Sequence, residues 1–518
     1  MKERYAYMGI MINLSVSKNL TQGEWEPAYE ETLQLIKDMP LVERSTMPID
    51  GIEVRCLGHT QERVQWQGDL GWKAEGDSDS LRMAEPFYLF RKLPFESDGT
   101  AGDPMLDMVL SGENTFGKNA YTLWCNKTQG EAYHMYLLAV AVTLADRLKG
   151  KVWVSGDITR GQLREAARLA NEILTNQVEI PDTCDIVRWY ERSTQLPISE
   201  DAKIDAFDEY ILVKKDSDYG EFLREHFSRD VLRKYWNRRF EGYTIGSSGF
   251  KRSICEYLRW GFKLEDLAAH ITLDVENEKA SCKKIIKSIL ETHVYEEGGR
   301  KTAFQTREPI DPDAGYPYGM GAMFADVTFG QFYRKNVERY IPLQELKEVL
   351  GKAYGDICDV DDVVDTYISA GCRDDSTFTI RERLDKECQK YRKVQEEYDV
   401  YDTRLLKYYE KEDQIAPDIV ESLQRTKDFM KEILEEEDFK ELLEGDPEKR
   451  CKWIVDQNQF FWLRKPDWDK IFKDVKKGKD AFERYYPIFR VDAAPSSIYD
   501  QCLALLINDT FFEYMSTL

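Results

Sequence analysis

Residues 133–174 read YHMYLLAVAVTLADRLKGKVWVSGDITRGQLREAARLANEIL, and this stretch decides the fold class. Apolar residues recur every three or four positions on both sides of a short β-compatible segment, which predicts a helix, a strand and a second helix. Gly150 is placed to end the first helix. Thr159 and Gln162 have the spacing of a capping box, which predicts where the second helix begins.

The residues before this stretch predict more strands and another helix. Residues 5–16 are rich in apolar and β-compatible types, which indicates a buried strand. A helix is expected next, because Thr21 and Glu24 also have capping-box spacing. Further strands are predicted at residues 52–57 and 87–91. Together these signals favour an α+β sandwich in the N-terminal part of the chain.

Strand signals become sparse after residue 180, where helical periodicity dominates and long helices are expected at residues 218–240 and 250–270. The predicted fold class is therefore α+β, with an N-terminal α+β sandwich domain followed by a larger, mostly α-helical region. The predicted domains are residues 1–180 as the α+β domain, 181–306 as a helical domain with a basic and aromatic island, 307–376 as a Gly/Pro-rich loop with short helices, and 377–518 as an acidic helical hairpin with a C-terminal helical segment.

Two long charged helices are predicted at residues 378–412 and 418–444. The first carries an apolar stripe with spacings near 3.5, and its aromatic composition favours packing within the chain as an antiparallel hairpin. Self-association through the same stripe is the alternative, so a homo-oligomer stays open.

Composition indicates a protein of the cytoplasm. Hydrophobic residues make up 42% of the 518 residues, enough to bury real cores. The ten cysteines are spread along the chain without a C-x-x-C pair, which favours reduced thiols in a reducing compartment. No apolar run approaches the length of a membrane span and no signal peptide is recognised, so no membrane partner is expected. The net charge of −23 repels nucleic acid at long range.

Charge is segregated along the chain. Residues 396–448 carry 19 acidic and 7 basic residues, whereas residues 229–263 carry nine cations and three carboxylates. Because cations neutralise phosphates and aromatic rings stack on bases, this second segment is a candidate site for nucleic acid or another polyanion. The residues expected at that site are Arg233, Lys234, Arg238, Arg239, Lys251, Arg252, Arg259 and Trp236.

Two other interpretations of residues 229–263 stay open. The rings could form a core while the cations pair with carboxylates of the same chain, including those of residues 396–448. Alternatively, the cations could bind an acidic protein. A Gly-Ser-Ser-Gly turn at residues 246–249 could also offer backbone amides to a phosphate.

Asp361, Asp362 and Asp365 spell D-D-x-x-D. Positions i and i+4 of a helix share a face, so Asp361 and Asp365 could hold Mg²⁺ and, through it, a diphosphate. The motif resembles the aspartate-rich motif of isoprenoid synthases, which are also all-helical, and the resemblance implies a Mg²⁺-dependent enzyme acting on a diphosphate substrate. Capping and the helix dipole also favour aspartates at a helix start, which is the structural alternative.

No other motif names a reaction. The five histidines are all more than five residues apart, and no phosphate-binding glycine loop is complete. We therefore predict a non-catalytic intracellular binding or regulatory protein that acts through protein–protein contacts and needs no cofactor. The alternatives are a nucleic-acid-binding or polyanion-binding component of a defence or regulatory complex, and the Mg²⁺-dependent enzyme.

Overall fold

The computed structural model describes most of the chain. The described residues are 10–64, 68–78, 83–109, 117–274, 276–292, 313, 341–370, 414, 417–435, 437–458, 461–490 and 506–518. They separate into two compact units, each assembled from three segments. The first unit comprises Met1–Glu24, Phe95–Cys125 and Ala141–Arg392, and the second comprises Trp25–Pro94, Asn126–Val140 and Lys393–Leu518.

A three-stranded sheet contains the N-terminal strand of the chain. Its strands, in the order in which they pair, are β7 (Ala120–Lys127), β1 (Met11–Ser17) and β8 (Val152–Gly156). β1 and β8 are antiparallel, and Leu14 lies opposite Val154. Most of β1 is buried, as its apolar sequence predicts. The predicted first strand is confirmed over the described part of residues 5–16.

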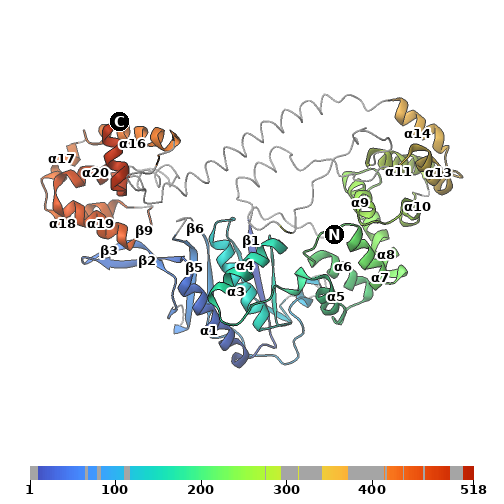
Figure 1. Ribbon diagram of the computed structural model, residues 1–518, viewed down its shortest axis with the longest axis horizontal. Helices are drawn as coiled ribbons and strands as arrows, with labels where there is room; N and C mark the ends of the chain where they lie inside the picture. Colours follow the sequence, from blue (N-terminus) through green and yellow to red (C-terminus); the bar gives the residue numbers. More distant parts are fainter. Residues whose placement is uncertain are drawn as a thin grey trace. The chain divides into compact units, whose positions relative to one another are not determined.

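The helix, strand and second helix predicted from residues 133–174 are confirmed as α3 (Tyr133–Arg147), β8 and α4 (Arg160–Ile173) (Figure 1). The capping box at the start of α4 is formed. Thr159 Oγ1 accepts from the backbone N–H of Gln162 over 3.1 Å, and the backbone N–H of Thr159 donates to Gln162 Oε1 over 3.1 Å. Leu163, Ala166 and Ala170 then form the buried stripe of α4.

The second sheet lies in the second unit and follows α1 (Gln22–Asp38). Its strands pair in the order β4–β5–β2–β3–β9, and β6 pairs with β5. The long β2–β3 hairpin turns at Asp50 and Gly51, both at positive φ, a conformation that a two-residue hairpin loop favours. The strand bounds are β2 (Leu41–Ile49), β3 (Ile52–His59), β4 (Arg63–Val64), β5 (Leu70–Asp77), β6 (Met83–Phe90) and β9 (Leu463–Arg464).

C-terminal helices pack on the β2–β3 hairpin, which the sequence did not indicate (Figure 1). Trp468 is fully buried there and donates its indole N–H to the carbonyl of Arg55 over 2.9 Å. β9 adds a short parallel strand beside β3. The helices of this part are α16 (Pro417–Ile433), α17 (Glu437–Leu443), α18 (Pro447–Gln457), α19 (Lys465–Lys477), α20 (Lys479–Arg490) and α22 (Asp509–Thr517).

The first unit continues after α4 as a helical region with one large apolar core. The predicted helix at 218–240 is two helices, because Ser228 caps a new helix after α7 has ended. The predicted helix at 250–270 likewise ends at Arg259 and resumes in a short helix. The helices that contribute to this core are α2 (Leu106–Val109), which precedes α4 in the chain, and α5 (Ile186–Thr194), α6 (Glu200–Tyr210), α7 (Ser217–His226), α8 (Arg229–Glu241), α9 (Ser248–Arg259), α10 (Leu264–Leu267), α11 (Glu278–Thr292), α13 (Leu343–Tyr354) and α14 (Val360–Ser369).

The α+β fold class is confirmed, with the sheets in the N-terminal part and a larger helical region after it. Residues 378–412 lie outside the described residues, and the helix predicted at 418–444 is present as α16 and α17. The four domain boundaries drawn from the sequence stay predictions. Within the described ranges, no helix is both long and apolar enough to cross a bilayer.

Candidate functional site

The segment with the predicted polyanion site folds as α8 and α9, and each of these helices begins at a capping serine. Ser228 Oγ accepts from the backbone N–H of Val231, and Ser247 Oγ accepts from that of Phe250, both over 3.3 Å. Gly246 lies at φ +87° and makes the turn between the helices. Ser247 belongs to the turn whose backbone amides were predicted to be available to a phosphate. Its side chain caps the N-terminus of α9.

The aromatic residues of α8 and α9 form a core. Trp236 is 0% exposed, and its ring centroid lies 4.9 Å from that of Tyr257 and 5.0 Å from that of Trp260. With its ring enclosed in this way, Trp236 has no face open to a base. The same core contains Tyr235, Phe240 and Phe250.

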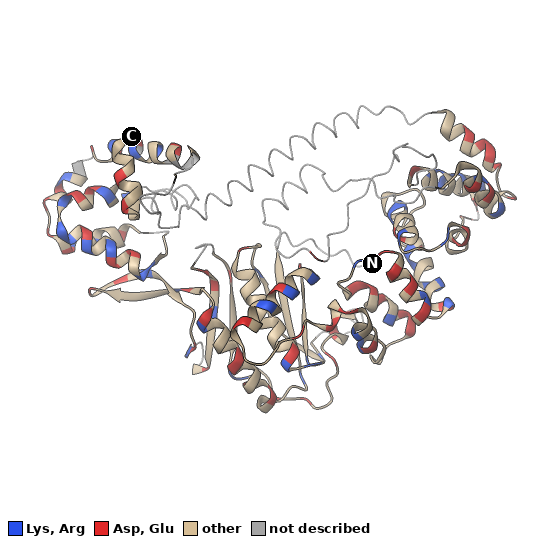
Figure 2. Cartoon of the chain, in the orientation of Figure 1, with Lys and Arg blue, Asp and Glu red and all other residues tan. Residues whose placement is uncertain are grey.

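Cations on the outer surface of α8 pair with carboxylates of α6. Arg238 Nη2 donates to both carboxylate oxygens of Asp205, over 2.8 and 3.0 Å. Asp201 lies 3.6 Å from Arg238 and 3.7 Å from Lys234, and Arg233 pairs with Asp230 within α8. Figure 2 shows basic and acidic positions interspersed over these helices. The carboxylates that neutralise Lys234 and Arg238 thus come from α6, which the sequence had not singled out.

Arg239 belongs to a buried network around Asp208. Its Nη1 donates to Asp208 Oδ2 over 3.2 Å, and the same carboxylate accepts from Tyr235, Tyr219 and Lys215 over 2.7 to 3.0 Å. Burial alone would raise the pKa of Asp208, but the positive charges of Lys215 and Arg239 outweigh it and lower that pKa. Arg239 also pairs with Glu256, so its charge is neutralised by carboxylates of the same chain.

The start of α9 has a different environment. Lys251 pairs with Glu291 of α11 over 2.5 Å, whereas Arg252 is exposed and Arg259 is half-buried. Among the described residues, Arg252 and Arg259 have no ion partner. The predicted site residues are therefore divided: most cations of α8 are neutralised from α6, whereas Arg252 and Arg259 of α9 have no ion partner within the described ranges.

α11 carries a row of lysines that the sequence reasoning missed. Lys279, Lys283 and Lys287 are exposed and four residues apart, so they share one face of the helix, with exposed Lys284 beside them. Glu291 lies between Lys251 and Lys287, which places the start of α9 beside this row. Periodic spacing of lysines in a predicted helix is the signal that could have found it. We call this set the basic face: Lys251, Arg252, Lys279, Lys283, Lys284 and Lys287.

Asp361, Asp362 and Asp365 lie in the first turns of α14, where Asp359 is the N-cap. Asp361 and Asp365 share a face, as predicted, but Lys347 of α13 lies between them. Its Nζ is 2.7 Å from Asp365 Oδ1 and 3.6 Å from Asp361 Oδ1. An ammonium group therefore occupies the position between the two carboxylates. No group of three or more potential metal ligands from His, Cys, Asp and Glu is found within the described part of the chain.

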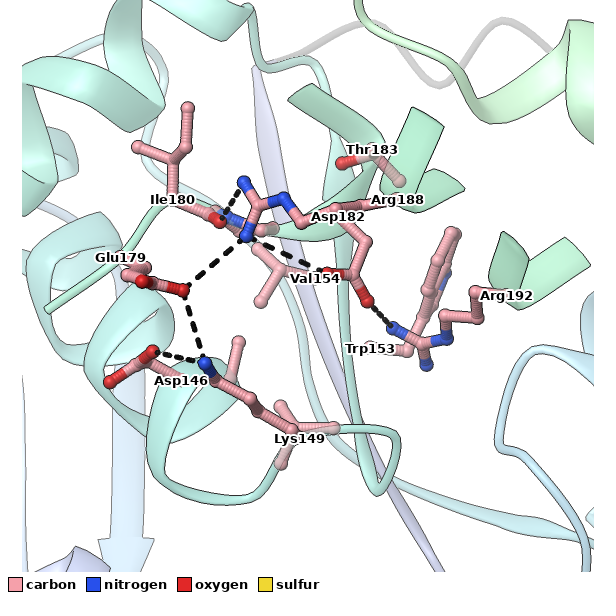
Figure 3. A pocket seen from close by; sticks show the side chains of 13 residues that line it. Asp146, Lys149, Trp153, Val154, Glu179, Ile180, Asp182, Thr183, Arg188 and Arg192 are labelled. Carbon is pink, nitrogen blue, oxygen red and sulfur yellow. Dashed lines mark hydrogen bonds and ion pairs between the residues drawn. The ribbon is translucent and has the colours of Figure 1, made fainter. Parts of the chain in front are cut away.

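A small depression in the first unit, with a cavity volume of about 30 Å³, lies between α3, β8 and α5 (Figure 3). Its wall is a chain of alternating charges. Lys149 lies 3.5 Å from Asp146 and 3.0 Å from Glu179, which lies 3.5 Å from Arg188. Asp182 continues the chain toward Arg192. Because each cation already faces carboxylates, the wall is close to neutral and favours neither anions nor cations.

No known protein family, no curated protein and no solved structure matches this chain. Function is therefore inferred from the contacts and charges described above. Among the charged surfaces described above, the basic face combines several exposed cations with few ion pairs to the rest of the described chain.

Proposed function

We propose that the protein is a cytoplasmic binding protein without catalysis of its own, which acts through contacts with a protein partner at the basic face. The observation that carries this proposal is the row of exposed lysines on α11. Lys279, Lys283 and Lys284 have no ion partner among the described residues, and Lys287 only approaches Glu291, at 3.8 Å.

The dimensions of the row favour a short acidic segment as the partner. Lys279 and Lys287 are eight positions apart, which is about 12 Å along a helix. A helix with carboxylates at every fourth position would place one opposite each lysine of the row. The partner we propose is therefore a protein that presents an acidic helix.

Nucleic acid bound at the same face is the second candidate, because a row of lysines can also neutralise successive phosphates. Two observations make it the weaker proposal. Trp236 and its neighbouring rings are buried, so they offer no stacking surface. The net charge of −23 also repels a long polyanion that extends past the basic face.

Charge reversal of the lysine row tests the proposal. Lys279, Lys283 and Lys287 are replaced together by Glu, and binding of a fluorescent helical peptide with Glu at every fourth position is measured at about 50 mM salt. We expect the full-length wild-type protein to bind and the variant to lose at least about tenfold in affinity. The matched control replaces Lys37, Lys92 and Lys118, which are exposed elsewhere, and should bind as the wild type does.

A mixed RNA and DNA pool, titrated under the same conditions, separates the two candidates. Binding of the pool but not the peptide, lost in the same variant, would replace the proposal by the nucleic-acid one. If the wild-type protein binds neither probe, the basic face is not a docking surface. Arg238 and Arg239 are left intact, because reversing their charge would break their contacts with Asp205 and Asp208.

A further inference from the structure

Two cysteine thiols meet in the interior of the helical region. Cys282 belongs to α11, and Cys358 lies in the turn between α13 and α14, 76 residues further along the chain. Their sulfur atoms are 2.8 Å apart, and both residues are buried. This distance lies between the bonded sulfur separation of about 2.0 Å and the optimum for unbonded heavy atoms of about 3.5–4.0 Å.

Helix packing brings the two thiols together. Cys282 is on the inner face of α11 with Ile285 and Ile286, and that face packs against α14. The backbone N–H of Cys358 donates to the carbonyl of Tyr354 over 3.0 Å, which fixes the turn after α13. The two sulfurs are therefore adjacent in the folded protein without any rearrangement of the helices.

We propose that Cys282 and Cys358 are a redox-responsive pair that hydrogen peroxide converts to a disulfide, which fastens α11 to the turn between α13 and α14. One thiolate attacks a peroxide oxygen, breaks the O–O bond and becomes a sulfenic acid, and the released hydroxide leaves as water after taking up a proton. The second sulfur then attacks the sulfenic sulfur and displaces a second water as its own proton is released. Two thiols and one peroxide thus give one disulfide and two waters.

The environment of Cys282 makes this reaction slow at neutral pH. Burial raises the pKa of Cys282, and the neighbouring Cys358 thiol adds to this effect, so that together they bring the pKa to about 12. Glu278 acts in the same direction, Lys283 opposes it, and the uncharged phenol of Tyr354 faces the pair from α13. Only a small fraction of Cys282 is thiolate near pH 7, so this thiol should react slowly with peroxide under mild conditions and respond to sustained oxidation.

Peptide mapping of the oxidised full-length protein tests the proposal. Cys125, an exposed thiol, is first replaced by Ser in all samples, which leaves nine of the ten cysteines. The protein is treated with hydrogen peroxide, its remaining thiols are alkylated in denaturant, and it is digested without reductant. We expect a linked peptide pair containing Cys282 and Cys358, a decrease from nine to seven titratable thiols, and recovery of both after reduction. The rate of linkage should rise by about tenfold per pH unit between pH 7 and 9, because the thiolate fraction does.

Two comparisons keep the test decisive. Cys282→Ser should prevent the linkage, and Cys255→Ser, a buried thiol elsewhere in the same region, should leave it unchanged. The second comparison keeps both Cys282 and Cys358: the thermal unfolding midpoint of the oxidised protein should lie at least about 3 °C above that of the reduced protein. Recovery of Cys282 and Cys358 in alkylated form after oxidation, or linkage of either to another cysteine, would overturn the proposal. This inference does not depend on the proposed function.

Discussion

Arg239 lies inside the helical region with its Nη1 3.2 Å from Oδ2 of Asp208. Asp208 is buried and the Arg239 side chain is 31% exposed, and Tyr235 and Tyr219 complete the hydrogen bonds of the carboxylate. Removing Arg239 would leave the buried Asp208 carboxylate with Lys215 as its remaining cation. A residue predicted from the sequence to contact a polyanion is thus part of the scaffold.

Replacing Asp208 by Asn should destabilise the protein. The amide keeps the size of the side chain but removes the carboxylate that Lys215, Arg239 and two tyrosine hydroxyls share, which costs roughly 1–3 kcal/mol, since Arg239 keeps Glu256 as a partner. Chemical denaturation followed by tryptophan fluorescence measures the change, because Trp236 and Trp260 lie beside Arg239.

Asp205→Asn is the matched control. Asp205 pairs with Arg238 at the surface, where its side chain is 52% exposed, so the same chemical change should cost about 0–1 kcal/mol. Equal losses in the two variants would show that the Asp208 network contributes no more than a surface ion pair.

Lys347 should prevent the aspartates of α14 from binding a divalent cation. Its Nζ lies between Asp361 and Asp365, and the hydrogen bond to Asp365 raises the pKa of Lys347, so the ammonium charge is retained. We expect calorimetry on the wild-type protein to show no saturable heat below about 1 mM Mg²⁺, with or without inorganic diphosphate. Lys347→Met should expose weak binding, whereas Lys352→Met, on the same helix, should not.

Mg²⁺ binding by the wild-type protein that disappears in Asp361→Ala would contradict this expectation. Since diphosphate is included in the titration, the same result would favour the Mg²⁺-dependent enzyme over the proposed binding protein. Heats that are unchanged in Asp361→Ala would instead place the ion elsewhere on the protein.

The sequence was sufficient where a structural signal is local. The Thr159 capping box, the strand before it and the apolar stripe of α4 depend on residues within a few positions of one another, and all three are present. The Asp50–Gly51 turn of the β2–β3 hairpin was equally local and could have been predicted, because Asp-Gly favours two-residue hairpin loops.

Partners that are distant in sequence could not be predicted. Whether Arg238 faces solvent or a carboxylate depends on Asp205, 33 residues earlier, and no periodicity connects the two. The same holds for Trp468, which bonds to Arg55 from 413 residues away, and for the meeting of Cys282 with Cys358. These pairs are set by how helices and strands pack, which a single sequence does not encode in a readable pattern.

Glu43 provides a pH-dependent test of the second sheet. It lies on β2 with its side chain 2% exposed and pairs with Arg63 over 2.8 Å. Burial raises the pKa of Glu43 from 4.5 to about 7, with a further rise from Glu75 and an opposing effect of Arg63 and Lys73. The folded protein therefore binds this proton more tightly than the unfolded chain does.

The stability that protonated Glu43 contributes is fully present below about pH 4.5 and is lost as pH rises to about 7. Glu43→Gln removes the titration and keeps the shape. The variant should match the wild type near pH 4.5 and exceed it by up to about 3 kcal/mol at pH 8, since one pKa unit is worth about 1.4 kcal/mol. Denaturation midpoints measured from pH 4.5 to 8 give the difference. Glu53→Gln, at an exposed position on β3, should show a flat difference over the same range. A wild type that gains stability relative to Glu43→Gln as pH rises would mean that Arg63 and Lys73 outweigh the cost of burying this carboxylate.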